Sequence, residues 1–222
     1  MRKVIMLAYH FPPLGGVAVM RVLRFTRYLR EFGYEPVVVS VDPSAQLPEP
    51  RDPGLLQELA SDLEVHRVPC LEPDNYANSW DFPRQKIRRN LFKTFDFLLV
   101  PDDRALWIGP AARKAVELAK KHRASLIWST AQPFSTLLAG VRASTSTGLP
   151  LVADFRDDWT TSNSDFRRSE AARQRKEKAQ EASVLARASA IFSVTPGIVE
   201  ALQKRAPEPA RVHFLPNGFD PA

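Results

Sequence analysis

Cysteine is almost absent from the sequence, which has Cys70 alone among 222 residues. A single cysteine excludes an internal disulfide framework and a cysteine metal cluster, and it favours a reducing compartment. Long apolar runs are absent too. Pro12-Pro13 and Gly15-Gly16 interrupt the apolar N-terminal stretch, and no window reaches the ~18 residues of a membrane span. We therefore expect a cytoplasmic protein with no transmembrane helix and no metal site.

The charge is not strongly of one sign. Lys and Arg number 31 against 25 Asp and Glu, a net charge of +6, which favours anionic partners such as phosphate groups or a membrane surface. Neither zinc-finger spacing nor an RNA-binding pattern of aromatic and basic residues is present, so we expect no nucleic-acid partner. The basic segment 84–93 also carries Ile87, Leu91 and Phe92. It could make peripheral contact with the inner face of a membrane, but its pattern favours packing on its own domain.

Two phosphate-binding motifs are missing as well. Nothing in the sequence matches G-x-G-x-x-G of dinucleotide-binding proteins, and nothing matches the P-loop pattern G-x-x-x-x-G-K-[ST]. These absences argue against a dehydrogenase or epimerase that binds its cofactor in the usual way.

Apolar strands alternate with amphipathic helices along most of the chain. This alternation predicts an α/β fold, a Rossmann-like doubly wound parallel sheet of about seven strands. Residues 42–109 break the pattern and read as an irregular insertion that contains one short strand. The expected strands are 3–9, 36–41, 65–68, 125–129, 149–155, 190–194 and 212–215, and the expected helices are 16–32, 110–122, 133–146, 165–188 and 196–205.

Two of these helices have informative faces. Helix 165–188 is highly charged, and we expect its basic residues to form a solvated face, with Glu177 and Glu181 offsetting part of the positive charge. Helix 16–32 should end at Gly33. The 3.6-residue period places Val22, Phe25, Leu29 and Phe32 on its core face and Arg21, Arg24, Arg27 and Arg30 in a basic stripe on another.

Ligands of doubly wound sheets bind beyond the carboxyl ends of the strands, so the loops that follow the strands are the candidate sites. Gly15 and Gly16 follow the first strand, where free N–H groups at a helix start suit a phosphate or a sugar hydroxyl. A tight turn that needs a positive φ is the alternative. Thr130 and Gln132 follow a later strand and offer a hydroxyl and an amide, with helix capping as the alternative.

The segment Asp154–Trp159 is the richest of these loops. Three carboxylates and one guanidinium follow an apolar strand, and charges of this kind must pair or meet solvent and ligand. Arg156 could bind a phosphate or carboxylate with two hydrogen bonds, and Asp157 or Asp158 could act as a base or bind a sugar hydroxyl. An internal Asp–Arg network that fixes the loop is the alternative.

Together these loops resemble the N-terminal domain of retaining glycosyltransferases of family 4, which have the GT-B fold. Only 101–103 and Trp107 match in the middle third of the chain. The residues that carry the resemblance are the aromatic-Pro-Pro-x-Gly-Gly start at 9–16, then 21–33, 129–140, the Asp-Phe-Arg-Asp-x-Trp motif at 154–159, 181–195, and the Asn-Gly-x-Asp segment at 217–220.

The resemblance implies one half of a two-domain enzyme. Residues 1–216 would form the N-terminal domain, residues 217–222 would begin the interdomain linker, and the donor-binding domain would lie outside this sequence. The implied activity is hexosyl transfer, with retention and without metal or other cofactor, from a nucleotide-sugar donor to a glycan or lipid-linked acceptor, as in polysaccharide biosynthesis. The isolated chain should be inactive, because half of the cleft would be elsewhere.

The resemblance also implies site residues. Arg156 stands where many family members have a histidine that contacts the transferred sugar, so that histidine's role does not carry over to it. A non-catalytic glycan- or partner-binding module of the same fold therefore stays open. Arg156 and Asp157 are the candidate catalytic residues, and donor or acceptor binding falls to Gly15, Gly16, Thr130, Gln132, Asp154, Trp159 and Asp102.

Overall fold

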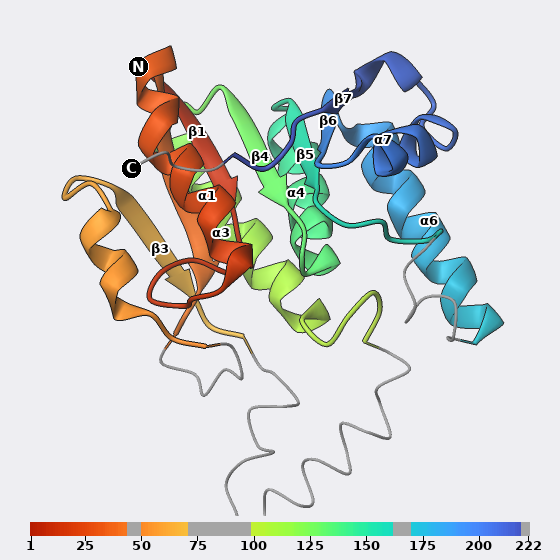
Figure 1. Cartoon of the computed structure of the whole chain (residues 1–222), viewed down its shortest axis with the longest axis horizontal. Coiled ribbons are helices and arrows are strands. Elements are labelled where there is room, and N and C mark those ends of the chain that lie inside the picture. The colour runs from red at the N-terminus through yellow and green to blue at the C-terminus, as the bar shows by residue number, and fades with distance from the viewer. Residues whose placement is uncertain (44–49, 71–98, 162–169, 219–222) are drawn as a thin grey trace, which may run out of the picture.

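Seven parallel strands form the centre of the structure (Figure 1). The computed structural model of the chain describes residues 1–43, 50–70, 99–161 and 170–218. The strand order β3-β2-β1-β4-β5-β6-β7, with every pairing parallel, confirms the predicted doubly wound sheet. The strands are β1 (Arg2–Leu7), β2 (Tyr34–Val41), β3 (Glu64–Val68), β4 (Leu126–Thr130), β5 (Leu151–Phe155), β6 (Ala190–Ser193) and β7 (Val212–Phe214).

Helices connect the strands and cover both faces of the sheet, as right-handed crossovers require. Among the described residues, the α-helices are α1 (Val17–Tyr28), α3 (Ile108–His122), α4 (Phe134–Thr147), α6 (Ala171–Arg187) and α7 (Pro196–Gln203). Short 3₁₀ helices are η1 (Leu29–Phe32), η2 (Pro53–Glu58), η5 (Ala105–Trp107) and η6 (Pro209–Arg211).

The core lies on the two faces of the sheet, because successive side chains of a strand point to opposite sides. On β1, Val4 and Met6 pack with Val22 of α1, whereas Ile5 and Leu7 pack in the cluster that contains the buried residues of α3 and α4. Both sets are almost completely buried. Strands that are apolar on both faces are typical of parallel sheets, which explains the unbroken apolar runs in the sequence.

The C-terminal turn of the first helix differs from the prediction. Residues 29–32 form the 3₁₀ helix η1, which has about three residues per turn rather than 3.6. The tighter winding rotates Phe32 off the face that Val22 and Phe25 share, so Phe32 is 75% exposed rather than in the core. Gly33 ends the turn in the left-handed conformation, with φ 79°, as the sequence predicts.

The predicted insertion at 42–109 is only partly described. Its described portion contains η2, β3 and η5, and α3 begins at Ile108, two residues before the expected start. The basic segment 84–93, the candidate for membrane contact, lies outside the described residues. Within the described ranges, no helix combines the length and apolarity needed to cross a bilayer.

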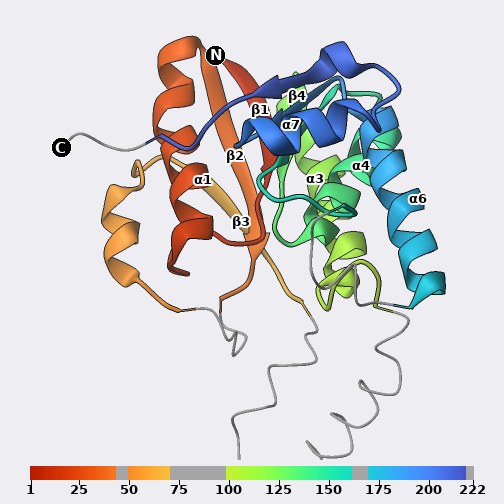
Figure 2. The same cartoon turned by 45° about the vertical axis from the view of Figure 1, so that its right-hand side comes forward.

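The chain reverses direction across the sheet between β1 and β4. From β1 it moves outward to β2 and β3, and it then returns through α3 to β4 and continues to the other edge. The loops after β1 and β4 therefore lie side by side where the strand order reverses, and in doubly wound sheets ligands bind at this place beyond the carboxyl ends of the strands. The segment after β7 runs back toward α1 in both views of the molecule (Figures 1 and 2).

Candidate functional site

The loops after β1 and β4 meet at this reversal point. His10, which follows β1, lies with its Nδ1 3.2 Å from the backbone oxygen of Gln132, which follows β4. A carbonyl oxygen only accepts, so Nδ1 of His10 donates the proton. His10 was not among the predicted site residues, although its place at the end of the first strand could have indicated it. The Gln132 side chain is exposed, whereas Thr130 is buried.

The glycine loop is shaped largely by a neighbouring segment of the chain. The Gly15 N–H donates to the oxygen of Pro50 at 2.7 Å, and a Cβ at Gly15 would lie 3.0 Å from Cβ of Asp52. Gly16 precedes α1 with φ 86°, a conformation that favours glycine. The Gly15 N–H is thus not free for a ligand as expected, and Gly16 fits the alternative of a tight turn that needs a positive φ.

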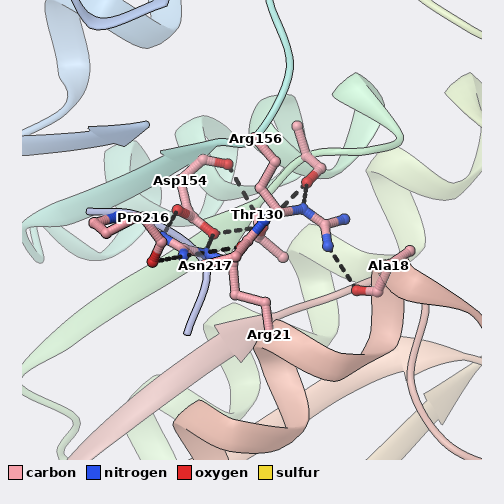
Figure 3. A network of polar contacts seen from close by, with 8 residues as sticks. Ala18, Arg21, Thr130, Asp154, Arg156, Pro216 and Asn217 are labelled. Atoms are coloured by element: carbon pink, nitrogen blue, oxygen red, sulfur yellow. Dashed lines mark hydrogen bonds and ion pairs between the residues drawn. The ribbon is translucent and has the colours of Figure 1, made fainter. Parts of the chain in front are cut away.

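Asp154 is the centre of a buried network (Figure 3). Its carboxylate is fully enclosed and accepts from Nε and Nη2 of Arg21, at 3.0 and 2.9 Å, and from Oγ1 of Thr130 at 2.8 Å. Arg21 was expected in a basic stripe away from the core face of the helix, and it is only 9% exposed. The cause is the carboxylate, since a guanidinium can be buried at low cost only where its donors are satisfied.

Arg156 points away from Asp154 and links two loops (Figure 3). Its Nε donates to the oxygen of Ala131, and its Nη1 donates to the oxygen of Ala18 at 2.6 Å. Burial lowers the pKa of Arg156, and the nearby charge of Asp154 partly opposes this effect. An arginine remains protonated at neutral pH all the same. Its Nη2 has no hydrogen-bond partner among the described residues, so that nitrogen can still bind an oxyanion.

The next three residues of the motif take different directions. Asp157 is exposed, and in the described parts of the chain its carboxylate makes no hydrogen bond or ion pair, although its charge acts on Arg156. Asp158 is buried and accepts from Nη2 of Arg205 at 3.0 Å and from the N–H of Thr161 at 2.9 Å. Trp159 is fully buried and stacks on Phe134 at 4.6 Å between ring centroids, so contact with donor or acceptor would require the residues above it to move.

Two carboxylates of α6 are buried under this loop, whereas Arg175, Lys176 and Lys178 of the same helix are exposed, as expected of its basic face. Glu177 accepts from Nε1 of Trp159 at 3.0 Å, and Glu181 accepts from Oγ1 of Thr160 at 2.6 Å and from Nε of Arg205 at 3.0 Å. Burial raises the pKa of Glu181, although the hydrogen bond from Thr160 and the charge of Arg205 act against the rise. Both glutamates are buried because the loop after β5 folds over α6.

Asp102 caps a helix in this structure. Its carboxylate accepts from the N–H and the hydroxyl of Ser135, at 3.0 and 2.6 Å, in the first turn of α4. Such a position satisfies the unpaired N–H groups at a helix start and benefits from the helix dipole. Burial raises the pKa of Asp102, and the hydrogen bonds from Ser135 oppose the rise. Ligand binding by Asp102 remains a prediction.

The polar residues of this site thus fall into two groups, those whose side chains are used in internal contacts and those that a ligand can reach. Asp154, Asp158 and Trp159 are committed to internal contacts, whereas after β5 Asp157 is exposed and Nη2 of Arg156 makes no hydrogen bond within the described ranges. A free carboxylate beside a guanidinium can orient a hydroxyl and stabilise a developing negative charge. Nothing in the described ranges gathers three or more His, Cys, Asp or Glu side chains around a common metal position.

Comparisons with solved structures support the fold. Anabaena HepE in complex with UDP and glucose aligns with a TM-score of 0.58, 16% identity, and coverage of 99% of this chain and 45% of that one. Phytolacca americana apo UGT2 aligns with a TM-score of 0.53 and 13% identity, over 99% of this chain and 52% of that one. Acinetobacter baumannii MurG aligns with a TM-score of 0.50 and 12% identity, over 100% of this chain and 47% of that one. The chain spans about half the length of these proteins. At such identities the likeness establishes the fold, here one half of a GT-B fold.

Sequence comparison identifies the family. Curated protein sequences give no match to the chain. A family model for the glycosyl transferase 4-like domain matches residues 15–218, which include the glycine loop, the Asp154–Trp159 segment and the stretch after β7. The chain therefore belongs to the glycosyl transferase 4-like domain family.

Proposed function

We propose that this chain is the acceptor-side half of a retaining glycosyltransferase, which moves a hexosyl group from a nucleotide-sugar donor to a glycan or lipid-linked acceptor. The observation that carries the proposal is a pair of charged residues at the end of β5: the exposed carboxylate of Asp157 acts on the guanidinium of Arg156, whose Nη2 makes no hydrogen bond within the described ranges. The family match and the GT-B fold support it.

In this proposal the two side chains have different tasks. Arg156 binds a phosphate or sugar oxygen through Nη2, and its bonds to the oxygens of Ala18 and Ala131 hold the guanidinium still. A donor fixed in advance costs no reorganisation when negative charge develops, which is where electrostatic catalysis gains most. Asp157 accepts a hydrogen bond from a hydroxyl of the sugar or the acceptor.

The remaining half of the cleft lies, in this proposal, in a longer polypeptide, and the test uses that polypeptide. Sugar transfer from a panel of labelled nucleotide sugars is measured for the wild type and for Asp157→Asn and Arg156→Gln. We expect kcat/KM to fall on the order of 10²-fold in each variant. The matched control is Arg113→Gln on α3, an exposed arginine away from these loops, which should keep its activity.

Unfolding temperatures separate catalysis from structure, because Arg156 also holds two loops. A variant that loses activity at an unchanged unfolding temperature supports the assigned role. Normal turnover in both variants would mean that this pair only fixes the loop. Binding of glycan without turnover of any donor would instead favour the non-catalytic module.

A further inference from the structure

Arg21 contacts a part of the chain that the proposed reaction does not explain. Besides its two bonds to Asp154, its Nη1 donates to the oxygen of Pro216 at 3.0 Å and to Oδ1 of Asn217 at 3.3 Å (Figure 3). One guanidinium therefore joins α1, β5 and the segment that leaves β7. These elements are far apart in the sequence, since Arg21 and Asn217 are separated by 196 positions.

The segment 216–218 has little else to hold it. The last backbone bond of the sheet in this region runs from the N–H of Leu215 to the oxygen of Ser193 at 2.9 Å. Pro216, Asn217 and Gly218 are exposed. Across the described part of the chain, the two bonds from Arg21 are the hydrogen bonds that reach these three residues.

The ion pair contributes more to position than to stability. A buried ion pair often stabilises no better than apolar residues of similar size, because desolvation offsets the attraction. Helix α1 already packs through Val19, Val22 and Leu23, which are fully buried. Apolar side chains could not replace the two hydrogen bonds that Nη1 of Arg21 donates to Pro216 and Asn217.

We propose that Arg21, oriented by Asp154, is a positioning residue that fixes the path of residues 216–218 across the strand ends beside α1. The guanidinium of Arg21 is planar: its Nε and Nη2 bind Asp154 of β5, and its Nη1 binds the oxygen of Pro216. Because Asp154 fixes the orientation of this group and α1 fixes its position, β5 and α1 together set the direction of the segment. If the proposed function holds, the segment carries the chain toward the other half of the cleft, and Arg21 sets where that half begins relative to the glycine loop.

The test measures the position of the segment directly and needs no activity. Nitroxide labels at Gly218→Cys and Glu117→Cys, in a Cys70→Ala background, report the distance from the segment to α3 by pulsed electron paramagnetic resonance. Both labelled positions suit the purpose, because a Cβ at Gly218 meets nothing within 4 Å and Glu117 is exposed. The wild type should give one narrow distance distribution.

The decisive variant replaces the ion pair with apolar residues, Arg21→Met with Asp154→Leu. Apolar replacement of the whole pair avoids an unpaired buried charge, so the fold should persist. We expect the narrow distance component to be lost while far-UV circular dichroism stays unchanged. The matched control, Arg30→Met with Asp62→Leu, removes an ion pair of η1, which directly follows α1, and it should leave the distribution narrow.

Arg21→Lys provides a second variant should the apolar pair fail to fold. Lysine keeps a positive charge for Asp154, but its single nitrogen cannot bridge the carboxylate and the segment as the fork of arginine does. The narrow component should again be lost. A folded variant of either kind that keeps the narrow distribution would overturn the proposal. Either result leaves the proposed sugar transfer to be judged by its own assay.

Discussion

Each side chain of the segment Asp154–Trp159 has its own environment, although the six residues are adjacent. Asp154 points into the ion pair with Arg21, and Asp158 points to Arg205. Phe155 and Trp159 enter the core, which leaves Asp157 and part of Arg156 accessible. Four of the six residues, Asp154, Phe155, Asp158 and Trp159, pack in the core or pair buried charges. Their main effect is therefore to hold the loop so that Arg156 and Asp157 keep a fixed orientation.

A glycine outside the predicted site is equally constrained. A Cβ at Gly140, on α4, would lie 2.7 Å from Cβ of Ser129 and 3.1 Å from Cδ1 of Leu151, so helix and sheet touch there. Gly140→Ala should lower the free energy of unfolding by about 1–3 kcal/mol, because overpacking outweighs the helix propensity of alanine. Urea denaturation measures the change.

The control for this prediction is Gly197→Ala, since Gly197 is also helical and a Cβ there meets nothing within 4 Å. That variant should be as stable as the wild type or more stable by up to about 1 kcal/mol. Equal effects of the two substitutions would show that close packing at Gly140 is not what matters.

At the scale of elements, α3 is joined to the edge strand β3 by a polar cluster. Glu64 of β3 accepts from Nε2 of His66 at 2.7 Å and lies 3.3 Å from Nζ of Lys121 and 3.1 Å from Nε2 of His122 on α3. The hydrogen bond from His66, followed by those from Lys121 and His122, lowers the pKa of Glu64 to about 2. Such contacts help to stabilise β3, an edge strand of which only Val68 is buried.

This pKa makes stability depend on pH with a definite sign. A carboxylate whose folded pKa lies below its unfolded value of 4.5 stabilises the fold above that value, and the contribution is lost as pH falls toward about 2. Glu64→Gln should therefore be less stable than the wild type at pH 6, and the difference should narrow by pH 3. Partial exposure of Glu64 keeps the difference small.

Urea denaturation of both proteins at the two pH values measures this narrowing. Glu117→Gln serves as a comparison on the exposed side of α3, where the carboxylate pairs with Lys114. A stability difference for Glu64→Gln that is constant across pH would contradict the assigned ionisation.

At the scale of the molecule, one sheet unites all the described elements, and its two faces carry separate tryptophans. Trp128 packs on the α1 side, whereas Trp107 and Trp159 belong to the cluster that includes α3 and α4. A continuous sheet between the two clusters should make their unfolding cooperative. The catalytic cleft, in the proposed function, needs a facing surface that these residues do not supply.

The chain by itself should therefore fold but not transfer sugar. We expect tryptophan fluorescence and far-UV circular dichroism to give coincident urea transitions, and product analysis with nucleotide sugars to give no turnover. Transitions that separate would indicate two independent folding units. Measurable transfer by the 222-residue chain would show that the facing surface is dispensable.

The sheet and the family could both be predicted from local sequence patterns. The alternation of apolar strands and helices is a local pattern, so the seven parallel strands were predictable, and the motifs at 9–16 and 154–159 were enough for the resemblance that the family match confirms. The exposure of individual charged residues was not predictable in this way. Arg21 was assigned to a basic stripe away from the core face, because periodicity describes one helix and not what lies opposite it.

The pairing of buried polar residues depends on contacts between segments that are distant in the sequence. The partners of Arg21, Arg156 and Glu181 come from other strands, loops and helices, and no local pattern encodes contacts over such separations. The same holds for Gly15, whose N–H is used by Pro50 from another loop. Secondary structure follows from neighbours in the sequence, whereas the burial of a charge follows from neighbours in space, because only a partner in space offsets its desolvation.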